Sequence, residues 1–119
     1  MQINLYLEIK KNKTKEVPCW KVEIKQDSVL SGVEITPPEY GYFKKPGSVY
    51  IFVKEDPERR CPFTVEKEYF SLEGVSCFST KEEADIFYRQ EILKKLEEID
   101  RYEEQFGKMK VKLLSCLKQ

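Results

Sequence analysis

Residues 78–106 read FSTKEEADIFYRQEILKKLEEIDRYEEQF, and this stretch decides the fold class of the chain. A hydroxyl residue followed three positions later by a glutamate is a capping box, in which both side chains satisfy free amides at a helix start. Thr80 with Glu83 and Ser79 with Glu82 both match this pattern. Apolar residues then recur every three or four positions, which predicts one apolar stripe along a long helix. The stripe consists of Ala84, Tyr88, Ile92, Leu96, Ile99, Tyr102 and Phe106.

The opposite face of this helix is charged, and several acidic residues precede a basic residue by four positions, which stabilises a helix modestly. We expect the helix to occupy residues 79–106 and to end at Gly107. A short C-terminal segment, residues 107–119, follows. Its lysines alternate with apolar residues as in a strand, but its apolar spacing is also helical, and a second helix is the favoured interpretation. The residues that keep helical spacing are Phe106, Met109, Leu113 and Leu117.

The length of the predicted helix bears on function. Residues 81–106 would extend roughly 39 Å at about 1.5 Å per residue, whereas strands of five or six residues span only about 20 Å. Part of the apolar stripe is therefore expected to overhang the sheet. We expect the C-terminal segment, a second copy of the chain or another partner to cover that part.

The first 78 residues are β-rich. Residues 3–9 alternate between apolar and polar side chains, which predicts a half-buried strand. Residues 20–25 alternate as well, with Lys21 and Glu23 on the polar side, so we expect the two strands to form a hairpin with a basic tip. Further strands are predicted at residues 29–35, 49–53, 63–70 and 75–78, the last two as a second hairpin and residues 49–53 as the central strand.

Together these elements predict one α+β domain over residues 1–119. Its expected architecture is a mostly antiparallel sheet of four to six strands, with one long C-terminal amphipathic helix packed across it. A chain of 119 residues is a common size for a single core. A hydrophobic content of 40% and an aromatic content of 13% are sufficient for that core and untypical of disorder.

Residues 36–48 contain three prolines and two glycines, so we expect them to form the longest loop. Long loops in compact domains are often functional, and aromatic residues beside lysines suit stacking on bases or anchoring a protein. The alternative is that Tyr42 and Phe43 fold back over a sheet edge. The candidate binding residues are Tyr40, Tyr42, Phe43, Lys44 and Lys45, together with Arg59 and Arg60 from a second polar turn.

The formal net charge is zero, so no global field draws the chain to nucleic acid or to an anionic membrane. The charge is nevertheless segregated. Residues 1–26 carry six lysines and three glutamates, residues 71–106 carry ten acidic and five basic residues, and residues 107–119 carry four lysines and no acidic residue. Apolar runs are too short to span a bilayer and the N-terminus lacks signal-peptide features, so we expect a cytoplasmic protein without a membrane partner.

Catalytic chemistry has little support in this sequence. The chain has no histidine, which is the commonest general base and metal ligand. Its four cysteines, Cys19, Cys61, Cys77 and Cys116, form no C-x-x-C pair, and no glycine-rich nucleotide motif occurs. We therefore expect buried free thiols, no metal, no cofactor and no enzyme activity.

The leading interpretation is a small non-catalytic interaction protein, an adaptor or inhibitor that binds a larger macromolecule. Viruses and mobile elements encode small inhibitors of this composition, and the analogy extends to such an origin. The alternative is a nucleic-acid-binding protein that uses lysine-rich turns and the aromatic loop. A third interpretation is an enzyme of carboxylate or cysteine type, with Cys61 beside two arginines as a nucleophile.

Overall fold

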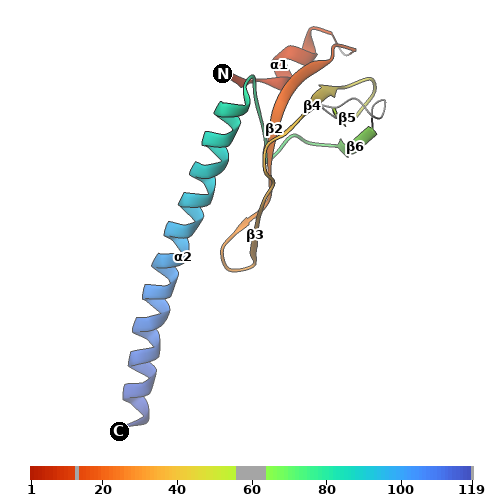
Figure 1. Cartoon of the computed structure of the whole chain (residues 1–119). Helices are drawn as coiled ribbons and strands as arrows, with labels where there is room; N and C mark the ends of the chain where they lie inside the picture. The colour runs from red at the N-terminus through yellow and green to blue at the C-terminus, as the bar shows by residue number, and fades with distance from the viewer. Residues whose placement is uncertain (13, 56–63, 119) are drawn as a thin grey trace.

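The computed structural model describes residues 1–12, 14–55 and 64–118, which form a small curved sheet, a short helix and one very long helix (Figure 1). The molecule is elongated, with extents of 70 × 30 × 26 Å. Its α+β class, antiparallel sheet and long C-terminal helix are as predicted. The elements are β1 (Gln2–Ile3), α1 (Leu5–Lys10), β2 (Val17–Ser28), β3 (Gly32–Ile35), β4 (Glu39–Lys44), β5 (Tyr50–Lys54), β6 (Thr64–Tyr69), β7 (Val75–Phe78) and α2 (Lys81–Leu117).

Among the described residues, the sheet has seven strands, more than the four to six predicted, and each of their pairings is antiparallel. Its order is β1-β7-β2-β4-β5-β6, and β3 pairs with the distal half of β2 outside this path. The twelve-residue strand β2 thus pairs with β7, β4 and β3. It holds the central position predicted for residues 49–53, which lie mainly in β5, between β4 and β6.

The predicted strand at residues 3–9 is wrong, because this segment divides into β1 and the helix α1. The Asn4 side chain caps the helix by accepting a hydrogen bond from the Leu7 amide at 3.3 Å. Leu5 and Ile9 are four residues apart on the buried face, whereas Leu7 is 60% exposed. Apolar residues at positions i and i+4 fit a helix as well as a strand. The first hairpin is therefore absent, and β1 pairs with β7.

The predicted loop at residues 36–48 is also wrong, because Glu39–Lys44 forms the interior strand β4 between β2 and β5. Its prolines all lie outside the strand, where the missing amide costs no ladder bond. Gly41 lies within it, and a Cβ there would come within 2.3 Å of the Val53 carbonyl oxygen and 2.6 Å of the Phe52 ring. Glycine is required here for close packing, although the sequence suggested a turn.

The second predicted hairpin does not form, although both of its strands do. β6 pairs with β5, and β7 pairs with β2 and β1. The connection turns at Gly74, whose φ of 78° favours glycine, and the Gly74 carbonyl accepts a 2.8 Å hydrogen bond from the Ile24 amide of β2. After this turn, β7 therefore pairs with the central strand β2 instead of with β6.

The long helix α2 begins where the capping box predicted. Thr80 is the N-cap: its hydroxyl donates to the Glu83 carboxylate at 2.9 Å and accepts from the Glu83 amide at 3.3 Å. The helix does not end at Gly107 but continues to Leu117. A glycine inside a helix costs only about 1 kcal/mol, and the lysines and apolar residues beyond it favour the helical state. Residues 108–117 are thus helical, as favoured, but they continue α2 and form no separate segment.

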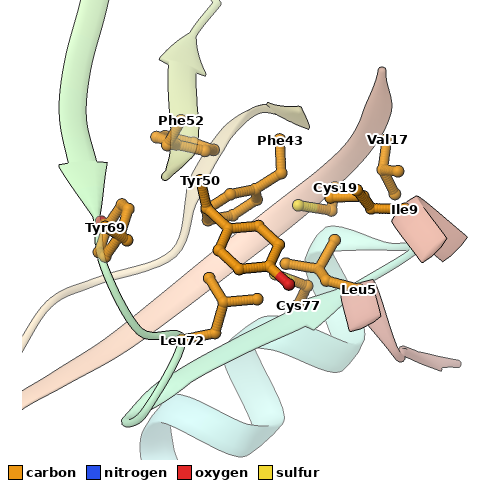
Figure 2. Close-up of a cluster of buried hydrophobic side chains, with 10 residues drawn as sticks. All are labelled: Leu5, Ile9, Val17, Cys19, Phe43, Tyr50, Phe52, Tyr69, Leu72 and Cys77. Carbon is orange, nitrogen blue, oxygen red and sulfur yellow. The ribbon is translucent and has the colours of Figure 1, made fainter. Parts of the chain in front are cut away.

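Two apolar clusters lie on opposite faces of the sheet. The larger one packs α1 against the sheet, with Phe43 and Phe52 fully buried and their ring centroids 4.8 Å apart (Figure 2). The smaller one joins Val22 of β2 and Phe78 of β7 to Ala84, at the start of α2. Beyond its first turns, α2 runs alongside the β2–β3 hairpin and then extends past the hairpin tip (Figure 1).

We expect the substitution Gly41→Ala to lower the free energy of unfolding by about 1–3 kcal/mol, because the added methyl group overpacks the contact with β5. Urea denaturation monitored by circular dichroism measures this change. Gly47→Ala is the matched control, since nothing lies within 4 Å of its added Cβ, and its effect should stay below about 0.5 kcal/mol. Equal stabilities of the two variants would contradict the close approach at Gly41.

Candidate functional site

The predicted aromatic binding residues lie in the interior strand β4 instead of in a loop. Tyr42 and Phe43 are buried, so neither side chain is presented to a partner in this fold. Tyr40 is half-buried, and its ring centroid lies 5.1 Å from that of Trp20. The alternative, in which Tyr42 and Phe43 fold back over a sheet edge, anticipated their burial but not their place in an interior strand. Arg59 and Arg60 lie outside the described residues.

Lys44 and Lys45 are partly exposed at the end of β4, close to α1. The Lys45 ammonium lies 4.7 Å from the Tyr50 ring centroid, and Tyr50 packs edge-on against Tyr6 of α1 at 5.9 Å. Tyr6 thus brings α1, which ends in the exposed lysines Lys10 and Lys11, to this part of the sheet body, by which we mean the sheet with α1 packed on it. The lysines of the C-terminal segment lie at the far end of α2, so the predicted basic groups are brought together only in part.

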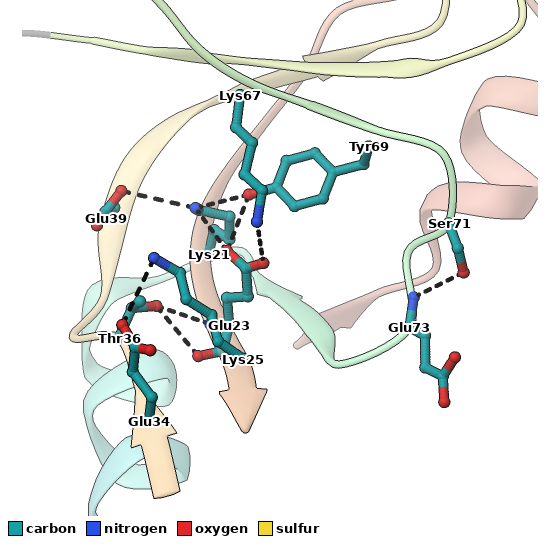
Figure 3. Close-up of polar contacts among 10 residues, drawn as sticks. All are labelled: Lys21, Glu23, Lys25, Glu34, Thr36, Glu39, Lys67, Tyr69, Ser71 and Glu73. Carbon is teal, nitrogen blue, oxygen red and sulfur yellow. Dashed lines mark hydrogen bonds and ion pairs between the residues drawn. The ribbon is translucent and has the colours of Figure 1, made fainter. Parts of the chain in front are cut away.

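A buried charge cluster is the site that sequence reasoning missed. Lys21 and Glu23 of β2 are only 2% and 5% exposed, although alternation placed them on the solvent side. The Lys21 ammonium donates to the Tyr69 hydroxyl at 3.0 Å, and that hydroxyl donates to Glu23 Oε2 at 3.0 Å (Figure 3). Lys67 donates to Glu23 Oε1 at 2.9 Å. The Lys21 ammonium also lies 3.7 Å from Oε2 of Glu39, its register partner on β4.

These contacts show that the sheet curves strongly. β6 lies three strands from β2 in the sheet order, which is about 14 Å in a flat sheet with the usual strand spacing. Tyr69 nevertheless reaches Glu23, so the sheet must fold over its own concave face. The charge cluster fills that face beside the larger apolar cluster, where the Lys21 ammonium lies 4.6 Å from the Phe52 ring centroid.

The electrostatics of the cluster are those of a structural element. Burial raises the pKa of Glu23, but hydrogen bonds from Lys67 and Tyr69 and the nearby Lys21 charge outweigh it, so the net pKa is lowered. Glu23 is therefore ionised at neutral pH and stabilises the buried Lys21 charge. Glu39 Oε2 has no hydrogen-bond partner among the described residues, but it retains its ion pair with Lys21. Two cations and two carboxylates balance one another.

An open hollow of about 380 Å³ lies between β1, α1 and β7. Its titratable lining residues are Tyr6 and Cys77. A hydrogen bond with Cys19 and burial raise the pKa of the Cys77 thiol, which keeps it protonated and unsuited to nucleophilic attack. Within residues 1–12, 14–55 and 64–118, no group of three or more Cys, Asp or Glu side chains is placed to hold a metal ion. Cys61 lies outside this part of the chain.

The remaining candidate site is on α2. We define the distal stripe as the apolar side chains that repeat with heptad spacing from the hairpin tip to the end of the helix. Lys95 contacts the Asp27 carboxylate near the tip, and residues 103–118 are all exposed. Phe106, Met109 and Leu113 are 49%, 52% and 66% exposed. The distal stripe consists of Ile99, Tyr102, Phe106, Met109, Leu113 and Cys116.

The stripe continues the helix face that packs on the sheet body. Ile92, Lys95, Ile99 and Tyr102 are half-buried along the side that the β2–β3 hairpin approaches, and Phe106 follows four residues later. Tyr102 and Phe106 stack with ring centroids 6.1 Å apart. Beyond the hairpin, the described residues 103–118 are all exposed, so this face is uncovered there. The overhang predicted from helix length is therefore present, and the continuation of α2 past Gly107 makes it longer than expected.

Comparisons with known proteins add no relative. No protein-family model matches the chain, and neither the curated proteins nor the solved structures compared with it give a match. In the described part of the chain, no helix combines the length and the apolar character needed to cross a membrane.

We expect Glu23→Gln to lower the free energy of unfolding by roughly 3 kcal/mol, because the buried Lys21 then loses one of its two carboxylate neighbours and keeps the 3.7 Å contact to Glu39 and the hydrogen bond to Tyr69. Urea denaturation at pH 7 measures this loss. Glu34→Gln is the control: its ion pair with Lys25 is exposed and 3.9 Å long, so its loss should cost less than about 1 kcal/mol.

The same two proteins can be compared by urea denaturation at lower pH. Because folding lowers the pKa of Glu23, its contribution is complete above the unfolded pKa of about 4.3 and is lost as the pH falls through the folded pKa. The native chain should therefore lose more stability between pH 7 and pH 3 than the Glu23→Gln variant does. Parallel pH profiles would show that Glu23 is not the ionised centre of the cluster.

Proposed function

We propose that this chain is a non-catalytic interaction protein, an adaptor or inhibitor that acts by association with a larger macromolecule. The observation that carries the proposal is the uncovered distal stripe on α2. Contiguous exposed apolar patches on small domains mark contact surfaces, and covering a phenylalanine or leucine is worth about 1.5–3 kcal/mol each. A helix with anchors at i, i+3, i+4 and i+7 is a common shape for protein recognition.

The arrangement of the chain supports the same proposal. The sheet body holds its buried charges in a closed, balanced cluster, which leaves little for chemistry. The helix, in contrast, carries apolar side chains outward on the part that contributes nothing to the core. An adaptor or inhibitor requires such a separation, since one part supplies stability and the other supplies contact. An origin in a virus or mobile element remains part of the proposal by analogy alone.

We expect Phe106→Asp to reduce capture of a protein partner from nuclease-treated native extract by about tenfold or more, because a charge then replaces a central anchor of the stripe. Quantitative pull-down with tagged chain measures this. Val111→Asp is the matched control: Val111 is 68% exposed and lies on the opposite side of α2, so the substitution introduces the same charge without touching the stripe. Equal capture by both variants would overturn the role of the stripe.

Nucleic-acid binding is the second candidate, and the lysines shared by the ends of α1 and β4 favour it. On this alternative, affinity for a labelled oligonucleotide falls steeply with salt, and Lys44→Gln with Lys45→Gln reduces the salt slope by about one for each lost phosphate contact. Lys108→Gln, far along α2, should leave the slope unchanged. Affinity that does not respond to salt would rule out this candidate.

A further inference from the structure

The distal half of α2 has its charges separated along its length. Residues 97–104 carry five acidic residues and one arginine, whereas residues 107–118 carry four lysines and no acidic residue. Within one straight helix these two blocks lie end to end and can meet only at their border. A second helix lying alongside with the opposite direction would place each acidic block against a basic block. The charge pattern of this segment is therefore complementary to that of the same segment in a second, antiparallel chain.

The distal stripe has the heptad spacing that such a pairing needs. Ile99, Phe106 and Leu113 repeat every seven residues, and Tyr102, Met109 and Cys116 repeat three positions later. This is the a and d pattern by which two helices interlock side chains along a shared seam. The hairpin approaches the same face near Lys95, Ile99 and Tyr102 at the start of the seam are half-buried, and every residue from 103 to 118 is exposed.

The register of an antiparallel pair follows from this spacing. With the two-fold axis between Gly107 and Lys108, each a residue meets a d residue of the second copy: Phe106 meets Met109, and Tyr102 meets Leu113. The flanking charges then match, because Glu103 of each chain lies beside Lys110 of the other. In a parallel pair, Glu98 of one chain would lie beside Glu103 of the other, which is repulsive. The charges therefore select the antiparallel direction.

We propose that the distal stripe binds a second copy of this chain, forming an antiparallel helix pair over residues 99–116. The proposal rests on the proposed function of the stripe as an association surface and names its partner. The overlap of about 27 Å at 1.5 Å per residue would end at the hairpin tip of each chain. The two sheet bodies would lie at opposite ends of the pair, so that the dimer offers any larger macromolecule two identical bodies.

Light scattering of the full chain gives the first test. The expected mass is twice the 14.1 kDa of one chain, falling to 14.1 kDa at lower concentration. Glu103→Lys should weaken the dimer by about tenfold or more, since two like-charged contacts replace two attractive ones. Adding Lys110→Glu to that variant should restore the dimer, because the two residues of each contact then exchange their charges and attract each other again. Glu104→Lys, on the opposite side of α2, should leave the mass unchanged.

Disulfide formation tests the direction, in a Cys61→Ser background. In the antiparallel pair Cys116 faces Ile99 of the second copy, so oxidation of the parent chain should give no cross-linked dimer, while Ile99→Cys should give one. A parallel pair brings the two Cys116 side chains together, and cross-linking of the parent chain would overturn the proposal. A monomer at all concentrations would overturn it too, yet loss of a different protein partner in Phe106→Asp would then still support the proposed function.

Discussion

The structure depends on β2, which must satisfy two different environments along its two faces. One face carries Val17, Cys19, Lys21 and Glu23 into the concave interior, and the other carries Trp20 and Val22 to the start of α2. Its length of twelve residues lets it pair with β4, β7 and β3 in succession. The sheet body, the hairpin and the direction of the long helix are therefore all set by one strand.

The buried charges on β2 and the curvature of the sheet depend on each other. An ammonium and a carboxylate removed from water need several hydrogen-bond partners, and a flat sheet offers them only side chains of the neighbouring strands, such as Glu39. Tyr69 and Lys67 supply these partners only because β6 folds over β2. Replacing the cluster with apolar residues of the same size could keep or raise stability, but it would remove a feature that distinguishes this curvature from a flatter pairing.

Sequence patterns within a few residues predicted the elements whose formation depends on neighbouring residues alone. The capping box and the three-four spacing located the start of α2 and most of its stripe, since both depend on residues within one turn; Leu96 of the predicted stripe is 50% exposed, and Lys95 lies on the packed face in its place. Residues 3–9 were misassigned because Leu5 and Ile9 satisfy both periods, and only Asn4 as a cap separates them. The strand β4 was not predicted because prolines flank it and Gly41 lies within it. The lack of space for a side chain at Gly41 is apparent only when β5 is placed beside β4. The burial of Lys21 and Glu23 arises from tertiary contacts alone.

The sequence predicted the overhang of the apolar stripe but not the burial of the aromatic residues in β4. The aromatic residues of β4 have the composition of a binding loop, yet composition cannot distinguish an anchor for a partner from an anchor for the core. The overhanging stripe followed from the lengths of helix and strand, which are physical dimensions and transfer directly from sequence. The continuation of α2 past Gly107 was not predicted, because a single glycine lowers helix stability without forbidding the helix.

The distal half of α2 gains nothing from the core, and this bears on why its apolar spacing is regular. A helical segment without tertiary contacts is marginal in water, and Gly107 weakens it further. Neighbouring pairs such as Lys108 with Glu104 add only a few tenths of a kcal/mol. Packing of the stripe against another helix would supply the missing stabilisation, so order in this half of the helix and occupancy of its apolar face are thermodynamically coupled.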